Sequence, residues 1–168
     1  MVKLVDSTPW IPLIGRLFIA FGSIERTSHD CIREWAGEKI HKHFAKASLS
    51  ARLALIADLC ESREASESTK KAFSAAVSEA RSLSKYRNLV AHNPLCLVFL
   101  QGDLDTQVLE AIASNVDDKH LRLEDLSKIA ESAERCETKL LQAFVTFRAE
   151  ALDLEHIEHF PGLGSRDG

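Results

Sequence analysis

The fold is decided by residues 10–35, which read WIPLIGRLFIAFGSIERTSHDCIREW. Inward-facing candidates recur along this stretch at alternating steps of three and four residues. They are Trp10, Leu13 with Ile14, Leu17, Phe21, Ile24, Ser28, Cys31 and Trp35. This spacing places the side chains on one face of an α-helix. The stretch therefore predicts a helix of about seven turns that faces a hydrophobic core.

Glycines interrupt this first helix at three positions. Gly15 and Gly22 share one face, which is typical of a helix that another backbone approaches closely. The alternative is that both are merely tolerated, each at a cost of about 1 kcal/mol relative to alanine. Gly37 follows the last turn of the stripe and is expected to kink or break the helix.

Three more helices are expected downstream. They span Ser48–Cys60, a stretch from Ser66–Ser68 to near His92, and Glu124 to about Glu155. The middle one must stop near His92, because Asn93 precedes Pro94 and a residue before proline is pushed out of the α region.

The segment between the last two helices has a different character. Leu95–Leu100 is apolar without a helical period, which predicts an extended segment or short strand. His120–Leu123 alternates and is expected to pair with it as a small hairpin. The whole insertion, residues 93–123, lies beside a helix end, where loops often shape a binding site.

These elements predict an all-α fold, an antiparallel bundle of about four main helices with a short extended or hairpin insertion before the last helix. Residues 1–160 are expected to form a single domain, and residues 161–168 a flexible C-terminal tail.

Composition narrows the function classes. The net charge of −4 over 168 residues argues against a broad nucleic-acid-binding face, although a small RNA site with local cations is compatible with it. The four cysteines are far apart, which predicts free thiols in a cytoplasmic protein and no zinc knuckle. No membrane association is expected, because charged residues and glycines break the longest apolar run.

Neither a metal nor another cofactor is expected. The pairs His41 with His43 and His156 with His159 resemble metal ligands, but no third ligand stands near either pair in the sequence. Solvated polar faces are the favoured interpretation of both pairs.

The chemistry of the chain is concentrated in residues 86–94, which read YRNLVAHNP. Asn88 and His92 lie four positions apart on one helix face, and the long side chain of Arg87 is expected to reach the same side. Arg87 can hold a phosphate through two hydrogen bonds. His92 can take a proton from a ribose 2′-hydroxyl or protonate a leaving 5′-oxygen.

This pair predicts a metal-independent ribonuclease with Arg87 and His92 as catalytic residues. One arginine and one histidine are few for such a reaction, and a symmetric homodimer would supply two of each. The alternative is structural, since both residue types commonly bind carbonyls or a carboxylate near a helix C-terminus.

Supporting roles are open for three further residues. Glu25 of the first helix either orients Arg87 or His92 or is simply solvated, and Arg16 is a weaker candidate to approach the same place. Tyr86 either stacks on a base or packs against the bundle.

The segment Arg87-Asn88-Leu89-Val90-Ala91-His92-Asn93-Pro94 resembles the Arg-polar-x(3–5)-His signature of HEPN domains (higher eukaryotes and prokaryotes nucleotide-binding). The resemblance implies a HEPN-like helical domain with the motif late in a central helix. It also implies an endoribonuclease site of Arg87, Asn88 and His92 at a homodimer interface, in a toxin–antitoxin, defence or RNA-processing system. The expected partners are then RNA and an antitoxin or other protein. A non-catalytic HEPN-like interaction or nucleotide-binding module is the alternative, because some members of the family have lost catalysis.

Overall fold

The computed structural model describes residues 5–101 and 106–151, and it confirms the expected fold class. The described elements are α1 (Trp10–Phe44), α2 (Leu49–Glu61), α3 (Glu67–His92), β1 (Leu95–Gln101), β2 (Thr106–Ala113), β3 (His120–Leu121) and α4 (Leu123–Ala151). The predicted end of the last helix near Glu155, the domain limit at 160 and the tail 161–168 all lie outside the described residues.

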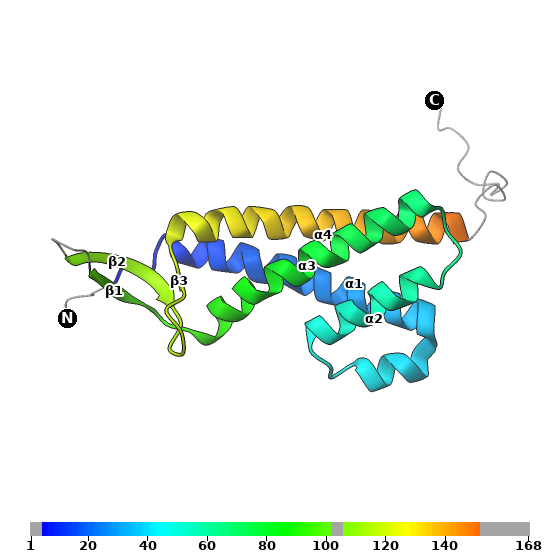
Figure 1. Cartoon of the computed structure of the whole chain (residues 1–168), viewed down its shortest axis with the longest axis horizontal. Helices are drawn as coiled ribbons and strands as arrows, with labels where there is room; N and C mark the ends of the chain where they lie inside the picture. The colour runs from blue at the N-terminus through cyan, green and yellow to red at the C-terminus, as the bar shows by residue number, and fades with distance from the viewer. Residues whose placement is uncertain (1–4, 102–105, 152–168) are drawn as a thin grey trace, which may run out of the picture.

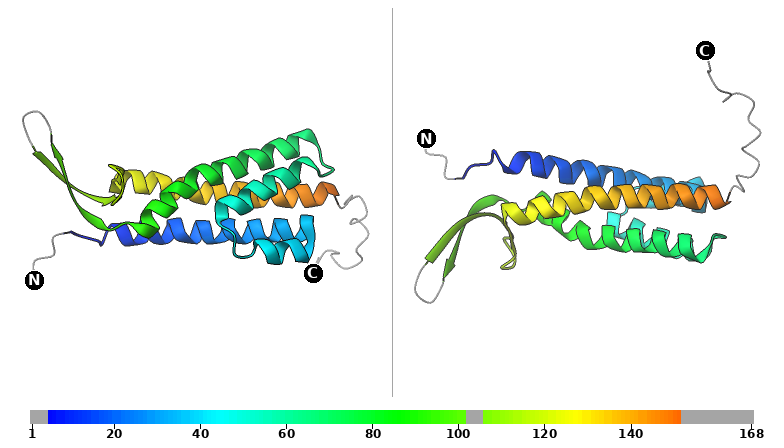
Figure 2. Two further views of the ribbon diagram at one scale, coloured as in Figure 1. Left: turned by 60° about the horizontal axis from the view of Figure 1, so that its bottom comes forward. Right: turned by 90° about the horizontal axis from the view of Figure 1, so that it is seen from above.

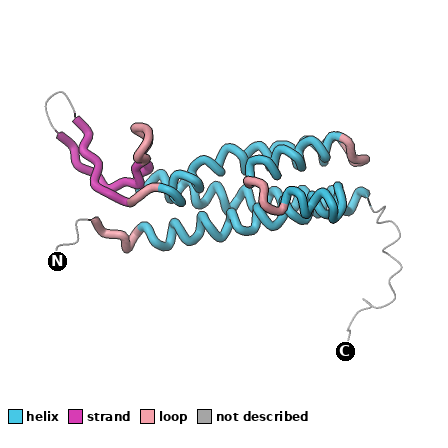
Figure 3. Tube along the Cα trace, turned by 90° about the horizontal axis from the view of Figure 1, so that it is seen from below, coloured by secondary structure: helices cyan, strands magenta, loops and turns pink. Residues whose placement is uncertain are grey.

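The helices form an elongated bundle. In Figure 1, α1 and α4 lie side by side and run in the same direction, while α3 crosses them in the opposite direction. The turned views in Figure 2 show α2 against α1 and α3, at the end of the bundle away from the strands. The strands gather at the other end, as Figure 3 shows, where α3 ends and both α1 and α4 begin. This arrangement places the end of α3 next to the insertion.

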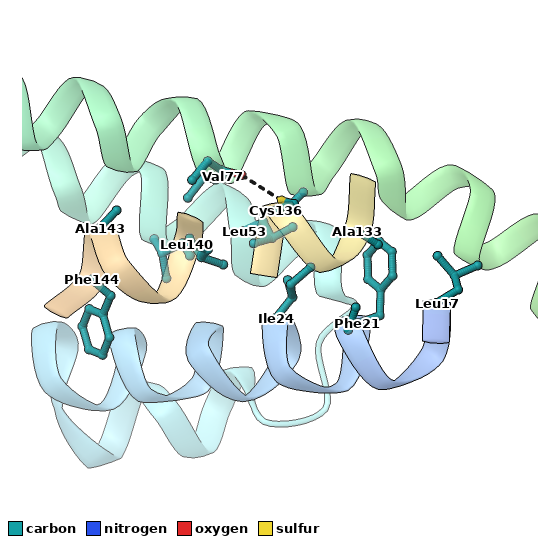
Figure 4. Close-up of a cluster of buried hydrophobic side chains, with 14 of the residues drawn as sticks. Leu17, Phe21, Ile24, Leu53, Val77, Ala133, Cys136, Leu140, Ala143 and Phe144 are labelled. Carbon is teal, nitrogen blue, oxygen red and sulfur yellow. Dashed lines mark hydrogen bonds between the residues drawn. The ribbon is translucent and has the colours of Figure 1, made fainter. Parts of the chain in front are cut away.

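Within the described residues, one buried cluster contains side chains from all four helices. Figure 4 shows Leu17, Phe21 and Ile24 of α1 in the same buried cluster as residues of α4, with Phe21 beside Ala133, as the apolar stripe of residues 10–35 predicts. Burying a large apolar side chain contributes about 1.5–3 kcal/mol. The cluster therefore holds the helices together, as expected for an amphipathic bundle.

Gly37 kinks α1, as the sequence predicts. Its backbone adopts φ 83° and ψ 168°, a conformation almost restricted to glycine. The close approach proposed for Gly15 and Gly22 is wrong, because a Cβ built on either residue meets no heavy atom within 4 Å beyond its neighbours and its own helix's nearby backbone. Both glycines are therefore simply tolerated, and neither marks a place where another backbone segment of the described residues packs closely against α1.

The insertion is a three-stranded antiparallel sheet in the order β1-β2-β3. The extended segment at 95–100 is confirmed, but its pairing with 120–123 is wrong. β1 pairs with β2, from Leu95 opposite Ile112, and β3 pairs with the far edge of β2 through Leu121 opposite Ile112. The sequence does not predict β2, because its glutamate and alanines have a low intrinsic preference for strands. Pairing with β1 stabilises the strand conformation of this segment.

Within the described residues, no helix combines the length and the apolar character needed to cross a lipid bilayer.

Candidate functional site

The motif occupies the last two turns of α3, and the helix ends where the sequence predicts. Asn93 leaves the helix with φ −127° and ψ 148°, as expected for a residue before proline. Its side-chain Nδ2 donates to the carbonyl oxygen of Leu89 at 2.8 Å, which satisfies one of the free carbonyl groups of the last turn. The position of His92, the last residue of α3, is therefore well defined.

Arg87 points toward α1. Its Nη2 atom lies 3.4 Å from Oε1 of Glu25, and the two side chains are 31% and 33% exposed. Its Nη1 donates to Oδ1 of Asn88 at 3.3 Å, and its guanidinium carbon lies 5.6 Å from the centre of the Phe18 ring. The contact between Glu25 and Arg87, one of the two alternatives for Glu25, is present. Glu25 thus orients the arginine.

A second arginine shares the same carboxylate. Nη2 of Arg52 lies 3.6 Å from the other oxygen of Glu25, and the Arg52 side chain is only 5% exposed. Its Nε donates to the Ser28 hydroxyl at 3.2 Å, and its Nη1 donates to the carbonyl of Ala47. Burial lowers the pKa of Arg52, and the charge of Glu25 acts in the opposite direction.

Arg52 and Arg87 border an open pocket of about 400 Å³ between α1, α2 and α3. Its other polar lining residues include Glu25, Ser48, Ser84 and Asn88. Two guanidinium groups against one carboxylate leave one excess positive charge. A pocket with this charge and these hydroxyl donors is suited to an anion such as a phosphate.

His92 borders a different pocket, of about 670 Å³, at the end of α3. Tyr86, Asn88 and Leu89 lie on the α3 side of this pocket, and the loop between β2 and β3 supplies the other wall. Arg87 does not line it, whereas Asn88 lines both pockets. Residues five apart on an α-helix point about 140° away from each other, which is why the two catalytic candidates separate. Within one chain, Arg87 reaches Asn88 as expected, but the expectation that it also reaches the side of His92 is wrong.

The remaining candidates fall in different places. Tyr86 is half-buried, with the Lys85 ammonium 4.9 Å from the centre of its ring, so the ring both packs and borders the pocket of His92. Arg16 forms an ion pair of 2.6 Å with Glu134 of α4 and lines neither pocket.

The histidine pairs carry no metal cluster in the part of the chain that the structure describes. Nε2 of His41 lies 3.1 Å from Nδ1 of His29, so His41 forms its hydrogen bond with His29, across the kink of α1, and not with His43. His156 and His159 lie outside the described residues.

Comparison with protein-family profiles, with curated proteins and with solved structures finds no match.

The sequence does not predict two of the residues that border these pockets, Arg52 and His120. Arg52 stands among the inward positions of α2, next to Leu53, and this break in the apolar pattern was a usable signal. The alternation of residues 120–123 places His120 in a short strand, but nothing in the sequence places it in the pocket of His92, which depends on the pairing of β3 with β2.

Proposed function

We propose that this chain is a HEPN-like, metal-independent endoribonuclease that acts as a homodimer in the cytoplasm. One observation carries the proposal: His92 lies in an open pocket large enough for a nucleotide, beside Tyr86 and Asn88. Ligand pockets in proteins commonly measure 300–1,000 Å³. The histidine is exposed at a helix end, where a substrate can reach it.

The proposed reaction uses few groups. One imidazole takes the proton of a ribose 2′-hydroxyl, whose oxygen attacks the adjacent phosphorus, and the 5′-oxygen leaves. Arg87 stabilises the negative charge that develops on the phosphoryl oxygens. Asn88 and Glu25 support the reaction, because Asn88 borders both pockets and Glu25 holds the Arg87 guanidinium.

The separation of Arg87 from His92 supports a dimeric site. A twofold axis near the end of α3 would bring Arg87 of one protomer to His92 of the other, and symmetry would produce two such sites. A role in a toxin–antitoxin or defence system, with an antitoxin or other protein as partner, accompanies this proposal.

The test is RNA cleavage by the purified chain in the presence of EDTA. Wild type is expected to cut single-stranded RNA, and Arg87→Ala and His92→Ala are each expected to lose at least about 100-fold in rate. His43→Ala, an exposed histidine away from both pockets, is the matched control. Full activity of His92→Ala would remove the basis of the proposal.

A second function has its own supporting observation. Arg87 packs over Phe18, pairs with Glu25, and has a buried Nε without a hydrogen-bond partner among the described residues. These contacts suit an arginine that joins α3 to α1 in a non-catalytic interaction or nucleotide-binding module. Such a module would bind nucleotides or a protein through the same pockets while leaving RNA intact.

A further inference from the structure

The pocket of His92 contains a second histidine, His120, on the opposite wall. We infer that His92 and His120 form a proton-transfer pair within one chain, and that their pocket receives a nucleotide of single-stranded RNA. This inference rests on the proposed ribonuclease function and adds a catalytic residue that the Arg-Asn-x-x-x-His segment does not contain.

The position of His120 is fixed by the sheet. It is the first residue of β3 and stands opposite Ala113 of β2. Its Nδ1 lies 3.4 Å from the carbonyl oxygen of Asp118, an acceptor that favours a proton on Nδ1. A neutral imidazole with its proton on Nδ1 presents Nε2 as the free acceptor, and in the charged form Nε2 donates as well. His120 can thus exchange a proton through Nε2.

The loop that carries this wall is joined to the end of α3. The backbone N–H of Asn115 donates to Oδ1 of Asn93 at 3.2 Å, one residue after His92. The N–H of Ser114 donates to the carbonyl of Lys119 at 2.9 Å, and the Ser114 hydroxyl accepts from the N–H groups of Val116 and Asp117. The two histidines therefore belong to one connected substructure, although 28 positions separate them in the sequence.

The charges of the pocket indicate the kind of substrate. Lys85 and Lys119 are balanced by Asp117 and Asp118, and Lys119 is ion-paired with Asp117, whose pKa is lowered by the hydrogen bond from that lysine. A balanced pocket does not concentrate anions in general. The ring of Tyr86, together with amide and carboxylate groups, suits a nucleobase, which stacks on aromatic side chains and hydrogen-bonds along its edge.

The proposed cleavage reaction balances its protons when both imidazoles take part. The neutral one accepts the 2′-hydroxyl proton as the O2′–P bond forms, and the charged one donates a proton to O5′ as the P–O5′ bond breaks. The products are a 2′,3′-cyclic phosphate and a 5′-hydroxyl. The pair has then exchanged its protonation states, and solvent restores them.

The experiment compares His120→Ala, His92→Ala and the control His43→Ala in metal-free cleavage of single-stranded RNA across pH 5–9. The loss expected for His120→Ala is about 100-fold or more in kcat/KM, with His43→Ala unchanged. Wild type is expected to show a bell-shaped pH profile, and His120→Ala is expected to lose one limb of it. His120→Gln, which keeps a polar side chain of similar size, repeats the test if the alanine variant does not fold.

The outcomes separate the inference from the proposed function. If wild type and His120→Ala cut equally well while His92→Ala does not, the histidine pair is wrong and the ribonuclease stands. If wild type cuts no RNA, both the proposed function and the proton-transfer role of the histidines are wrong. Titration with uridine 3′-monophosphate then tests only whether the two histidines share a nucleotide-binding pocket. Movement of the His92 and His120 imidazole NMR signals supports the pocket, and no movement of the His120 signal overturns it.

Discussion

At the scale of single residues, two arginines that share the carboxylate of Glu25 have different roles. Arg52 is buried and also donates to Ser28 and Ala47, so its removal takes one interaction away from each of three groups, the third being the Glu25 carboxylate. We expect Arg52→Ala to lower the free energy of unfolding by roughly 2–4 kcal/mol, because buried partners lose their hydrogen bonds. Arg87 and Glu25 are each about one-third exposed, and their pair is worth about 1 kcal/mol or less. Urea unfolding of Arg52→Ala and Arg87→Ala measures both free energies. An equally large loss of stability for Arg87→Ala would show that the main role of Arg87 is structural.

His29 makes stability depend on pH. Burial, followed by the charge of Arg52, lowers the pKa of His29 below its ordinary value of 6.5. The unfolded chain therefore binds this proton at a higher pH than the folded chain does. The free energy of unfolding is expected to fall as the pH drops from about 6.5 toward the lower folded pKa, and to be retained above that window. Melting temperatures from pH 7.5 to 5 should show this slope in wild type and a weaker one in His29→Gln. An unchanged slope in His29→Gln would contradict the assignment, and the exposed His43→Gln is the control.

At the scale of elements, the glycines of α1 differ in what they do. Gly37 has φ 83° and ψ 168°, where a side chain is strained, so Gly37→Ala is expected to cost roughly 2 kcal/mol or more. Gly22 is helical with open space around a built Cβ, so Gly22→Ala is expected to stabilise by about 0.5–1 kcal/mol. Chemical denaturation of the two variants tests this opposition. A stabilising Gly37→Ala would mean that α1 runs straight in solution.

The helices were predictable from sequence, whereas the sheet and the pocket were only partly so. The period of Leu17, Phe21 and Ile24 reports a helix face directly, because all three are buried in the same core. β2 has no such signal, because its strand character comes from pairing with β1. The contact of Glu25 with Arg87 was among the expected alternatives. The five-residue spacing of Arg87 and His92 already indicates that the two side chains point about 140° apart on the helix. Spacing alone does not show which pocket each side chain borders, because the packed helices and the loop after β2 form those pockets.

At the scale of the whole molecule, the direction of the helices brings the candidate groups to one end. Because α3 runs opposite to α1 and α4, its last turn lies at the end of the bundle that carries the sheet (Figure 1). The loop after β2 then brings His120 to the pocket of His92, while Arg87 remains at the seam with α1. The proposed site thus takes its histidines from one protomer and its arginine from the other.

Mixing inactive variants tests this division of the site. In a twofold dimer, a chain with Arg87→Ala paired with a chain with His92→Ala keeps one complete site, made of Arg87 from one protomer and His92 from the other. After subunits exchange, half of the dimers are mixed, so about one quarter of the wild-type activity should return. Arg87→Ala mixed with His120→Ala should recover to the same extent. His92→Ala mixed with His120→Ala should stay inactive, because both histidines must come from one chain. RNA cleavage before and after mixing measures these outcomes, and light scattering confirms the mass of the dimer. If subunits exchange and no mixture recovers activity, the whole site lies within one protomer.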